Sequence, residues 1–269
     1  MTLRHSRLLR ELNAGQNPCT LKLNLNDPRI VEMAGLAGAS AVWLCNEHVP
    51  NDWTNLENQV RAAKLHDLDS IVRVSKGSYS DYVKPFEMDA TAIMVPHVGT
   101  AEEARKIVEM TRFMPLGRRP IDGGNIDGGF CQIPIVDYLR HGNSERLLIL
   151  QIESPEALAN VEEIAAVPGF DMLLFGPGDF SHIIGKAGQV GAPEVVAARR
   201  RVAAAAQKHG KYLMMPGMIA PLAELEAEGW RIFNLGADVV SLGSAFNTLV
   251  AGYKGATATT PAAVYNTKS

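Results

Sequence analysis

The chain has 269 residues, of which 46% are hydrophobic, and a formal net charge of −3. A chain of this length can bury roughly three quarters of its unfolded surface in one core. The longest basic run, Arg199–Arg201, is short, and no apolar run approaches the roughly 20 residues of a membrane-spanning helix. We therefore expect neither nucleic acid nor a membrane as a partner.

The cysteines and the first fifteen residues indicate the cellular compartment of the protein. Cys19, Cys45 and Cys131 lie far apart and form no CxxC pair, which indicates a reducing environment. The first fifteen residues carry three arginines but lack the apolar segment of a signal peptide. The sequence predicts a cytoplasmic protein, with a basic transit sequence as the alternative.

Strand-like and helix-like runs alternate along the chain. The opening segment predicts an amphipathic helix with Leu8, Leu9 and Leu12 facing inward. Strands are expected at Cys19–Leu25, Ala41–Leu44, Asp69–Val74, Ala92–Pro96, Leu147–Glu153, Asp171–Phe175, Tyr212–Met215 and Arg231–Leu235. Helices are expected from Asp27-Pro28 onward, at Asn55–His66, Ser80–Met88, Thr100–Met110, between Glu153 and Asp171, and at Ala192–His209, Pro221–Glu228 and Asp238–Tyr253.

Eight such units in about 250 residues favour a closed α/β barrel over an open, doubly wound α/β sheet. Alternation at this spacing predicts a parallel (β/α)8 TIM barrel with an N-terminal helix. We expect a single domain over residues 1–269, with an irregular tail at 254–269. Met114–Ile135, which contains IDGG twice, interrupts the rhythm, and loops of this length are usually functional or mobile.

Two acids stand just past two neighbouring strands in Leu147–Gly185. Glu153 follows LLILQI, and Asp179 follows the strand and GPG turn of the next unit. The carboxyl ends of parallel strands share one rim, where α/β proteins carry out chemistry. A divalent cation such as Mg²⁺ often takes only one or two protein carboxylates. The alternative is structural, with Glu153 beside a helix start and Asp179 as a helix cap.

Three further side chains lie near strand ends. His48 is suited to proton transfer near neutral pH, and His97 is its main rival. Arg73 ends a buried strand and needs a partner, which a bound carboxylate or enolate oxygen would supply. The alternatives are a solvated histidine, and an ion pair of Arg73 with Glu47 or Glu87.

These motifs together resemble the HpcH/HpaI aldolase family, metal-dependent pyruvate-type aldolases on a (β/α)8 barrel. The resemblance covers about Leu21 to Leu249. Its segments are AVWLCNEHVPND (41–52), SIVRV (70–74), IMVPHVGTAEEARKIVEMTRFMPLGRR (93–119), LQIESPEALANVEEIAAVPGFDMLLFGPGDFS (150–181) and LGADVVSL (235–242). The QIE and GP-x-D-x-S pair at this separation is its most specific part.

The resemblance implies an aldolase that cleaves or forms a 4-hydroxy-2-oxo acid, giving pyruvate and an aldehyde through a metal-bound enolate. Glu153 and Asp179 would hold Mg²⁺, Mn²⁺ or Co²⁺. Arg73 would bind the substrate carbonyl, and His48 would move the proton at the alcohol. The remaining assignments share a supporting role: Gln151 and the backbone N–H groups of Gly178 and Asp179 would position the substrate, and Glu87 would support the histidine across a subunit interface of a trimer or hexamer.

The sequence departs from the family at three places. Cys45 stands where the family usually has an Asp that orients the histidine, and Gly178 replaces the usual Ala. Arg119 is followed by Pro120 and the IDGG loop in place of the family's usual segment. These departures leave two alternatives open: an oxaloacetate-type decarboxylase or lyase on the same site, and a catalytically degenerate family member that binds an oxo acid.

Overall fold

The computed structural model describes residues 3–217 and 219–255. Within them, parallel strands close into one barrel in the order of the chain, which confirms the predicted α/β architecture. The strands are β1 (Cys19–Leu23), β2 (Ala41–Cys45), β3 (Asp69–Arg73), β4 (Ala92–Val95), β5 (Leu147–Ile152), β6 (Met172–Phe175), β7 (Tyr212–Pro216) and β8 (Ile232–Ala237). Their register pairs Cys45 with Arg73, so these two side chains end neighbouring strands at the same level.

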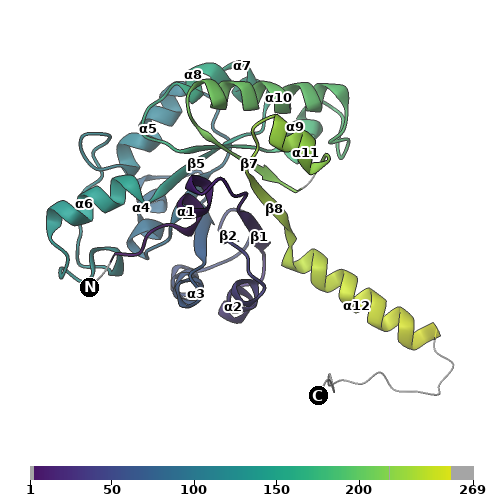
Figure 1. Ribbon diagram of the computed structural model, residues 1–269, viewed down its shortest axis with the longest axis horizontal. Coiled ribbons are helices and arrows are strands. Elements are labelled where there is room, and N and C mark those ends of the chain that lie inside the picture. The colour runs from purple at the N-terminus through teal and green to yellow at the C-terminus, as the bar shows by residue number, and fades with distance from the viewer. Residues whose placement is uncertain (1–2, 218, 256–269) are drawn as a thin grey trace.

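Helices connect the strands and cover the barrel (Figure 1). They are α1 (Arg7–Asn13), α2 (Pro28–Leu36), α3 (Trp53–Leu65), α4 (Tyr79–Glu87), α5 (Ala101–Thr111), the 3-10 turn η1 (Ile126–Gly128), α6 (Ile135–Ser144), α7 (Pro155–Ala159), α8 (Val161–Ala165), α9 (Pro177–Ile183), α10 (Pro193–Lys208), α11 (Leu222–Ala227) and α12 (Asp238–Gly255). Asp27 caps α2 through the N–H of Arg29, as predicted. The prediction omitted α6. This helix begins directly after Pro134, and no side chain caps its first turn.

The N-terminal helix α1 closes the end of the barrel at which the strands begin. Leu8 is fully buried among the inward-facing side chains of the strands, and Leu9 and Leu12 pack against the same cluster, as predicted. Asp69, at the start of β3, accepts the Ser6 hydroxyl at 2.7 Å and the Leu8 N–H at 2.9 Å. This anchoring leaves the opposite rim, where the strands end, for chemistry.

The last helix, α12, extends away from the barrel (Figure 1). Its start is tied to the residues that follow β1, because the Asp238 carboxylate accepts the N–H groups of Asn24 and Leu25, each at 2.9 Å. Beyond Asp238 the helix exposes large apolar side chains, among them Phe246 and Tyr253. The predicted irregular tail is wrong for residues 254 and 255, which belong to α12, and its remainder (256–269) lies outside the described residues. Along the described chain, no helix is both long enough and apolar enough to cross a membrane.

Candidate active site

A pocket of about 320 Å³ opens at the rim where the strands end. Its walls come from the ends of β2, β3, β5, β6 and β7 and from the start of α9. The lining residues are Trp43, Arg73, Gln151, Glu153, Leu174, Gly176, Pro177, Gly178, Asp179, Val190, Pro216 and Ile219. The pocket thus brings together Arg73, Gln151, Glu153, Gly178 and Asp179, all of which the sequence placed in one site.

Glu153 is the buried acid of this pocket, with an exposed fraction of 1%. Its Oε1 accepts the N–H of His97 at 2.7 Å, and its Oε2 accepts Nε2 of Gln151 at 2.9 Å. Burial raises the pKa of Glu153, and the nearby carboxylates of Asp179 and Glu47 add to this effect, whereas His97 opposes it. The site therefore holds a carboxylate whose negative charge is poorly compensated by protein groups alone.

Asp179 supplies the second, solvent-facing acid. It stands in the first turn of α9, which begins with Pro177 after Gly176. An acid at this position is favoured by the unpaired N–H groups at a helix start. Gly176 lies against Glu153, because a Cβ built on it would meet Glu153 Cβ at 2.7 Å and Oε2 at 2.8 Å. The turn before α9 therefore sits directly on the buried carboxylate.

Arg73 is the buried cation of the site, with an exposed fraction of 6%. Its Nε lies 3.0 Å from Glu47 Oε2, its Nη2 donates to Cys45 Sγ at 3.0 Å, and its guanidinium stacks 4.9 Å from the Trp43 ring centre. The ion pair with Glu47 was one of the structural alternatives, and it forms at the edge of the pocket. Planar contacts of this kind fix the orientation of a guanidinium.

His48 lies beside the pocket and does not line it. Its ring is largely exposed, and its Nε2 is 3.4 Å from Glu47 Oε2. Cys45 Sγ accepts the backbone N–H of His48 at 3.4 Å, so the thiol holds the loop of this histidine and the guanidinium of Arg73 together. His48 thus reaches the site through Glu47, a residue that the sequence suggested only as an ion-pair partner of Arg73.

Glu87 does not line the rim pocket, and its charged neighbours in the described chain include Arg119 and Asp127. It ends α4, and η1 packs against this helix. Burial raises the pKa of Glu87, which Arg119 opposes and Asp127 reinforces. Arg119 pairs with Asp127 at 3.1 Å, and Asp127 accepts the Tyr138 hydroxyl at 2.8 Å. Within one chain the structure therefore brings Glu87 to the IDGG loop, and the predicted support of His48 would have to come from another copy.

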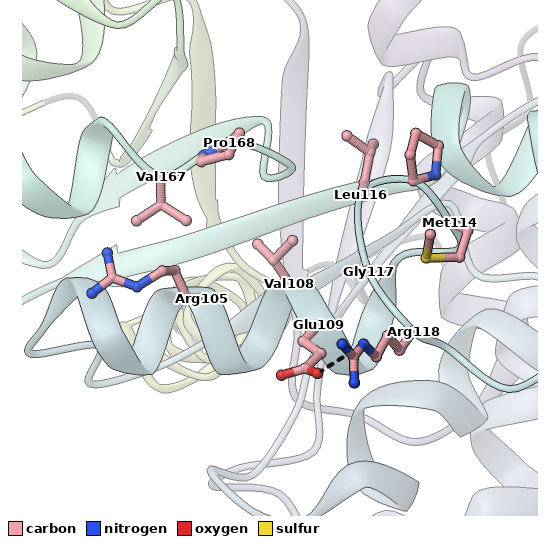
Figure 2. Close-up of a pocket in the computed structure, with 10 residues that line it drawn as sticks. Arg105, Val108, Glu109, Met114, Leu116, Gly117, Arg118, Val167 and Pro168 are labelled. Carbon is pink, nitrogen blue, oxygen red and sulfur yellow. Dashed lines mark ion pairs between the residues drawn. The ribbon is translucent and has the colours of Figure 1, made fainter.

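A second pocket, of about 400 Å³, lies beside α5 (Figure 2). The end of α5, the turn at residues 114–118 and Val167-Pro168 line it, and Arg118 pairs with Glu109 at 3.5 Å. Val167 and Pro168 precede β6, so this pocket is at the end of the barrel where the strands begin. It contains none of the residues that the sequence assigned to chemistry.

The donor set at the rim fits a divalent cation. Glu153 and Asp179 offer oxygen ligands, and Gln151 Oε1 is buried with no hydrogen-bond partner among the described residues. A cation would also stabilise the charged form of Glu153, whose pKa is raised by burial first and by the nearby carboxylates of Asp179 and Glu47 second. In residues 3–217 and 219–255, no three His, Cys, Asp or Glu side chains converge as a ready-made metal cluster. A cation here would rely on two carboxylates plus water or substrate, a pattern common for Mg²⁺.

A closed (β/α)8 barrel with two carboxylates and a buried arginine at its rim defines a barrel enzyme with a small polar active site. Its sequence matches the HpcH/HpaI aldolase/citrate lyase family over residues 19–245, and the chain belongs to this family. The predicted family resemblance is thereby confirmed. Together with the aldolase relatives described next, the family match identifies the chain as a lyase.

Three similar proteins place the chain within this family. It is 35% identical over 220 residues to 5-keto-4-deoxy-D-glucarate aldolase of Klebsiella pneumoniae, covering 82% of this chain and 83% of that protein. It is 33% identical over 198 residues to hydroxypyruvate/pyruvate aldolase of Pseudomonas aeruginosa, covering 74% of each. The crystal structure of an HpcH/HpaI aldolase from Desulfitobacterium hafniense superposes with a TM-score of 0.86 at 26% identity, covering 94% of this chain and 99% of the other.

Proposed function

We propose that this protein is a divalent-metal-dependent aldolase that cleaves or forms a 4-hydroxy-2-oxo acid, with pyruvate and an aldehyde as the other partners. The observation that carries the proposal is the meeting of Glu153, Asp179 and Arg73 in one rim pocket. The names of the two aldolase relatives support the reaction class. Mg²⁺, Mn²⁺ and Co²⁺ are the proposed metals, held by Glu153 and Asp179.

The reaction breaks the bond between C3 and C4 of the substrate. The C4 hydroxyl loses its proton and becomes the aldehyde, while the electron pair of the broken bond moves to C3 and into the adjacent 2-oxo group. A divalent cation, when bound, polarises that oxo group and lowers the barrier to this step. C3 then takes up a proton, which gives pyruvate.

The residues of the chain divide this work between them. Arg73 offers a fixed positive charge where negative charge develops on the substrate oxygen. His48 is the proposed acceptor of the hydroxyl proton, with Glu47 between it and Arg73. Gln151 and the backbone N–H groups of Gly178 and Asp179 are proposed to position the substrate.

An oxaloacetate-type decarboxylase or lyase is the second candidate, and Cys45 is the observation that favours it. In the described part of the chain, the Cys45 thiol contacts the Arg73 guanidinium and the His48 backbone N–H, and it makes no hydrogen bond to the His48 imidazole. A decarboxylation forms the same electron-rich C3 without removing a hydroxyl proton, so it makes less demand on His48.

The proposed assembly is a homo-oligomer, a trimer or hexamer, in which a second copy covers α12. Support comes from the exposed Val240, Phe246, Leu249 and Tyr253 on a helix that extends from its own barrel. In this assembly Glu87 of one copy would approach His48 of another. Sedimentation velocity tests the proposal, because a monomer at micromolar concentration would exclude it.

The proposed location of the protein is the cytoplasm. The free cysteines of the described chain support this proposal.

A coupled assay of pyruvate release tests the function. A panel of 4-hydroxy-2-oxo acids and oxaloacetate is offered to metal-depleted protein with and without added Mn²⁺. We expect turnover only with metal, and we expect Glu153→Ala to abolish it. Full activity in excess EDTA, or unchanged turnover of the variant, would contradict the metal role. Release of pyruvate from oxaloacetate alone would select the decarboxylase.

A further inference from the structure

His97 adopts a backbone conformation that residues other than glycine rarely take. It follows β4 and Pro96 and has a φ of +53°. A non-glycine residue in this region costs free energy, and such residues persist where surrounding contacts hold them. At the rim, both the N–H and the carbonyl of His97 have hydrogen-bond partners that can hold this conformation.

Two groups hold the His97 backbone. Its N–H donates to Glu153 Oε1 at 2.7 Å, and its carbonyl accepts Nζ of Lys76 at 2.8 Å. Lys76 in turn pairs with Glu103 near the start of α5, and Glu103 Oε2 accepts the N–H of Gly99 at 3.0 Å. The turn after β4 is thereby fastened to the buried acid on one side and to α5 on the other.

The imidazole of His97 connects two carboxylates of the site. Its Nδ1 lies 3.0 Å from Glu153 Oε1, and its Nε2 lies 3.4 Å from Glu47 Oε1. His48 approaches the same Glu47 from the other oxygen, at 3.4 Å from Oε2. The two histidines therefore flank Glu47, but of the two only His97 contacts Glu153.

These contacts give the two oxygens of Glu153 different roles. Oε1 is occupied by the N–H and the ring of His97. Oε2 accepts Gln151 and lies towards Gly176, on the side where α9 presents Asp179. Contacts at both oxygens fix the orientation of the carboxylate, with His97 on Oε1 and the Gln151 amide on Oε2. Groups that orient metal ligands in this way affect metal affinity strongly.

We propose that His97 is a positioning residue of the cation site, which clamps Oε1 of Glu153 so that Oε2 faces Asp179. The inference rests on the proposed function, because it assumes that Glu153 and Asp179 bind a divalent cation. It adds a residue that contacts the ligand acid without being a ligand itself. His97 thereby has a role distinct from that of His48.

The test measures the dissociation constant of Mn²⁺ alone from the full-length protein, with free Mn²⁺ quantified by electron paramagnetic resonance. His97→Gly removes the ring and keeps the backbone, since glycine adopts positive φ readily. We expect it to weaken Mn²⁺ binding by about tenfold or more. His97→Asn tolerates the same backbone and carries an amide nitrogen near the position of Nδ1, so it should retain most of the affinity. His48→Asn is the matched control and should bind Mn²⁺ as the wild type does.

Each result has one meaning. Equal Mn²⁺ affinity of His97→Gly and wild type overturns the inference and leaves the proposed function intact. An equal loss in His48→Asn also overturns it, because that histidine does not touch Glu153. A wild-type protein that binds no Mn²⁺ overturns the proposed function instead. If His97→Gly does not fold, the test uses Lys76→Met, which removes the hydrogen bond to the His97 carbonyl. Weaker Mn²⁺ binding by Lys76→Met, together with unchanged Mn²⁺ binding by His97→Asn, supports the clamp. Unchanged Mn²⁺ binding by both variants refutes it.

Discussion

The close approach of Gly176 to Glu153 leads to a sharp prediction for Gly176→Ala. The added Cβ would lie 2.7 Å from Glu153 Cβ and 2.8 Å from Oε2, both well inside van der Waals contact. The backbone itself accepts alanine, since φ at Gly176 is −97°. The strain therefore falls on the contact with Glu153, whose side chain is buried and has little room to move.

Overpacking by a single methyl group in a tight site costs about 1–3 kcal/mol of folding free energy. For a protein of this size, each kcal/mol corresponds to about 2–4 °C in the melting temperature. We expect Gly176→Ala to melt several degrees below the wild type. It should also bind Mn²⁺ more weakly and turn over more slowly, because Glu153 must shift away from α9 to make room.

Gly178 provides the matched control two residues away. A Cβ built on it meets no atom within 4 Å, and it lies in α9, where alanine is the better helix former by up to about 1 kcal/mol. Differential scanning fluorimetry of the metal-free proteins, followed by Mn²⁺ titration, compares the two variants. Gly178→Ala should match or exceed the stability of the wild type. If Gly176→Ala behaves like Gly178→Ala in both measurements, the steric reasoning is refuted.

Two further predictions concern Cys45 and His141. Cys45→Asp places a carboxylate beside Arg73 and near the His48 loop, and we expect faster aldol turnover, with Cys45→Ser as the control; a sharp drop would show a positive role for the thiol. Burial lowers the pKa of His141 to about 4, so the unfolded chain, with a pKa near 6.5, binds the proton first. Stability should therefore fall as the pH drops from 6.5 to about 4, by about 3 kcal/mol at most, and His141→Gln should remove this part of the acid sensitivity in urea unfolding. Parallel pH profiles for wild type and variant would contradict the assignment.

The fold was predictable because most strands are short, largely apolar runs and several helices between them begin at a capping Ser, Thr or Asp. Leu8, Leu9 and Leu12 predicted α1 as an amphipathic helix with one face against the barrel, and the Asp27-Pro28 pair marked the start of α2. The prediction failed to find α6, which follows the glycine-rich loop and begins at Ile135, directly after Pro134, without a side-chain cap. Its position depends on packing against that loop, which local sequence does not reveal.

The candidate site was predictable where a residue ends a strand. Glu153 and Arg73 share the rim because parallel strands end there together, and Asp179 follows from the start of α9. The contacts of His97 depend on a positive φ that no neighbouring glycine announces. The place of Glu87 depends on how the IDGG loop folds back onto α4, and this is a tertiary contact between distant segments.

The fastening of α1 to Asp69 has a practical consequence for immobilising the enzyme. Arg4, Ser6 and Leu8 all contact Asp69, at the barrel end where the strands begin. A support or affinity tag joined ahead of Arg4 is therefore attached on the side away from the rim pocket. Molecules tethered in this way would present the pocket to the solution, whereas a deletion that reaches Ser6 would remove part of the anchor that closes the barrel.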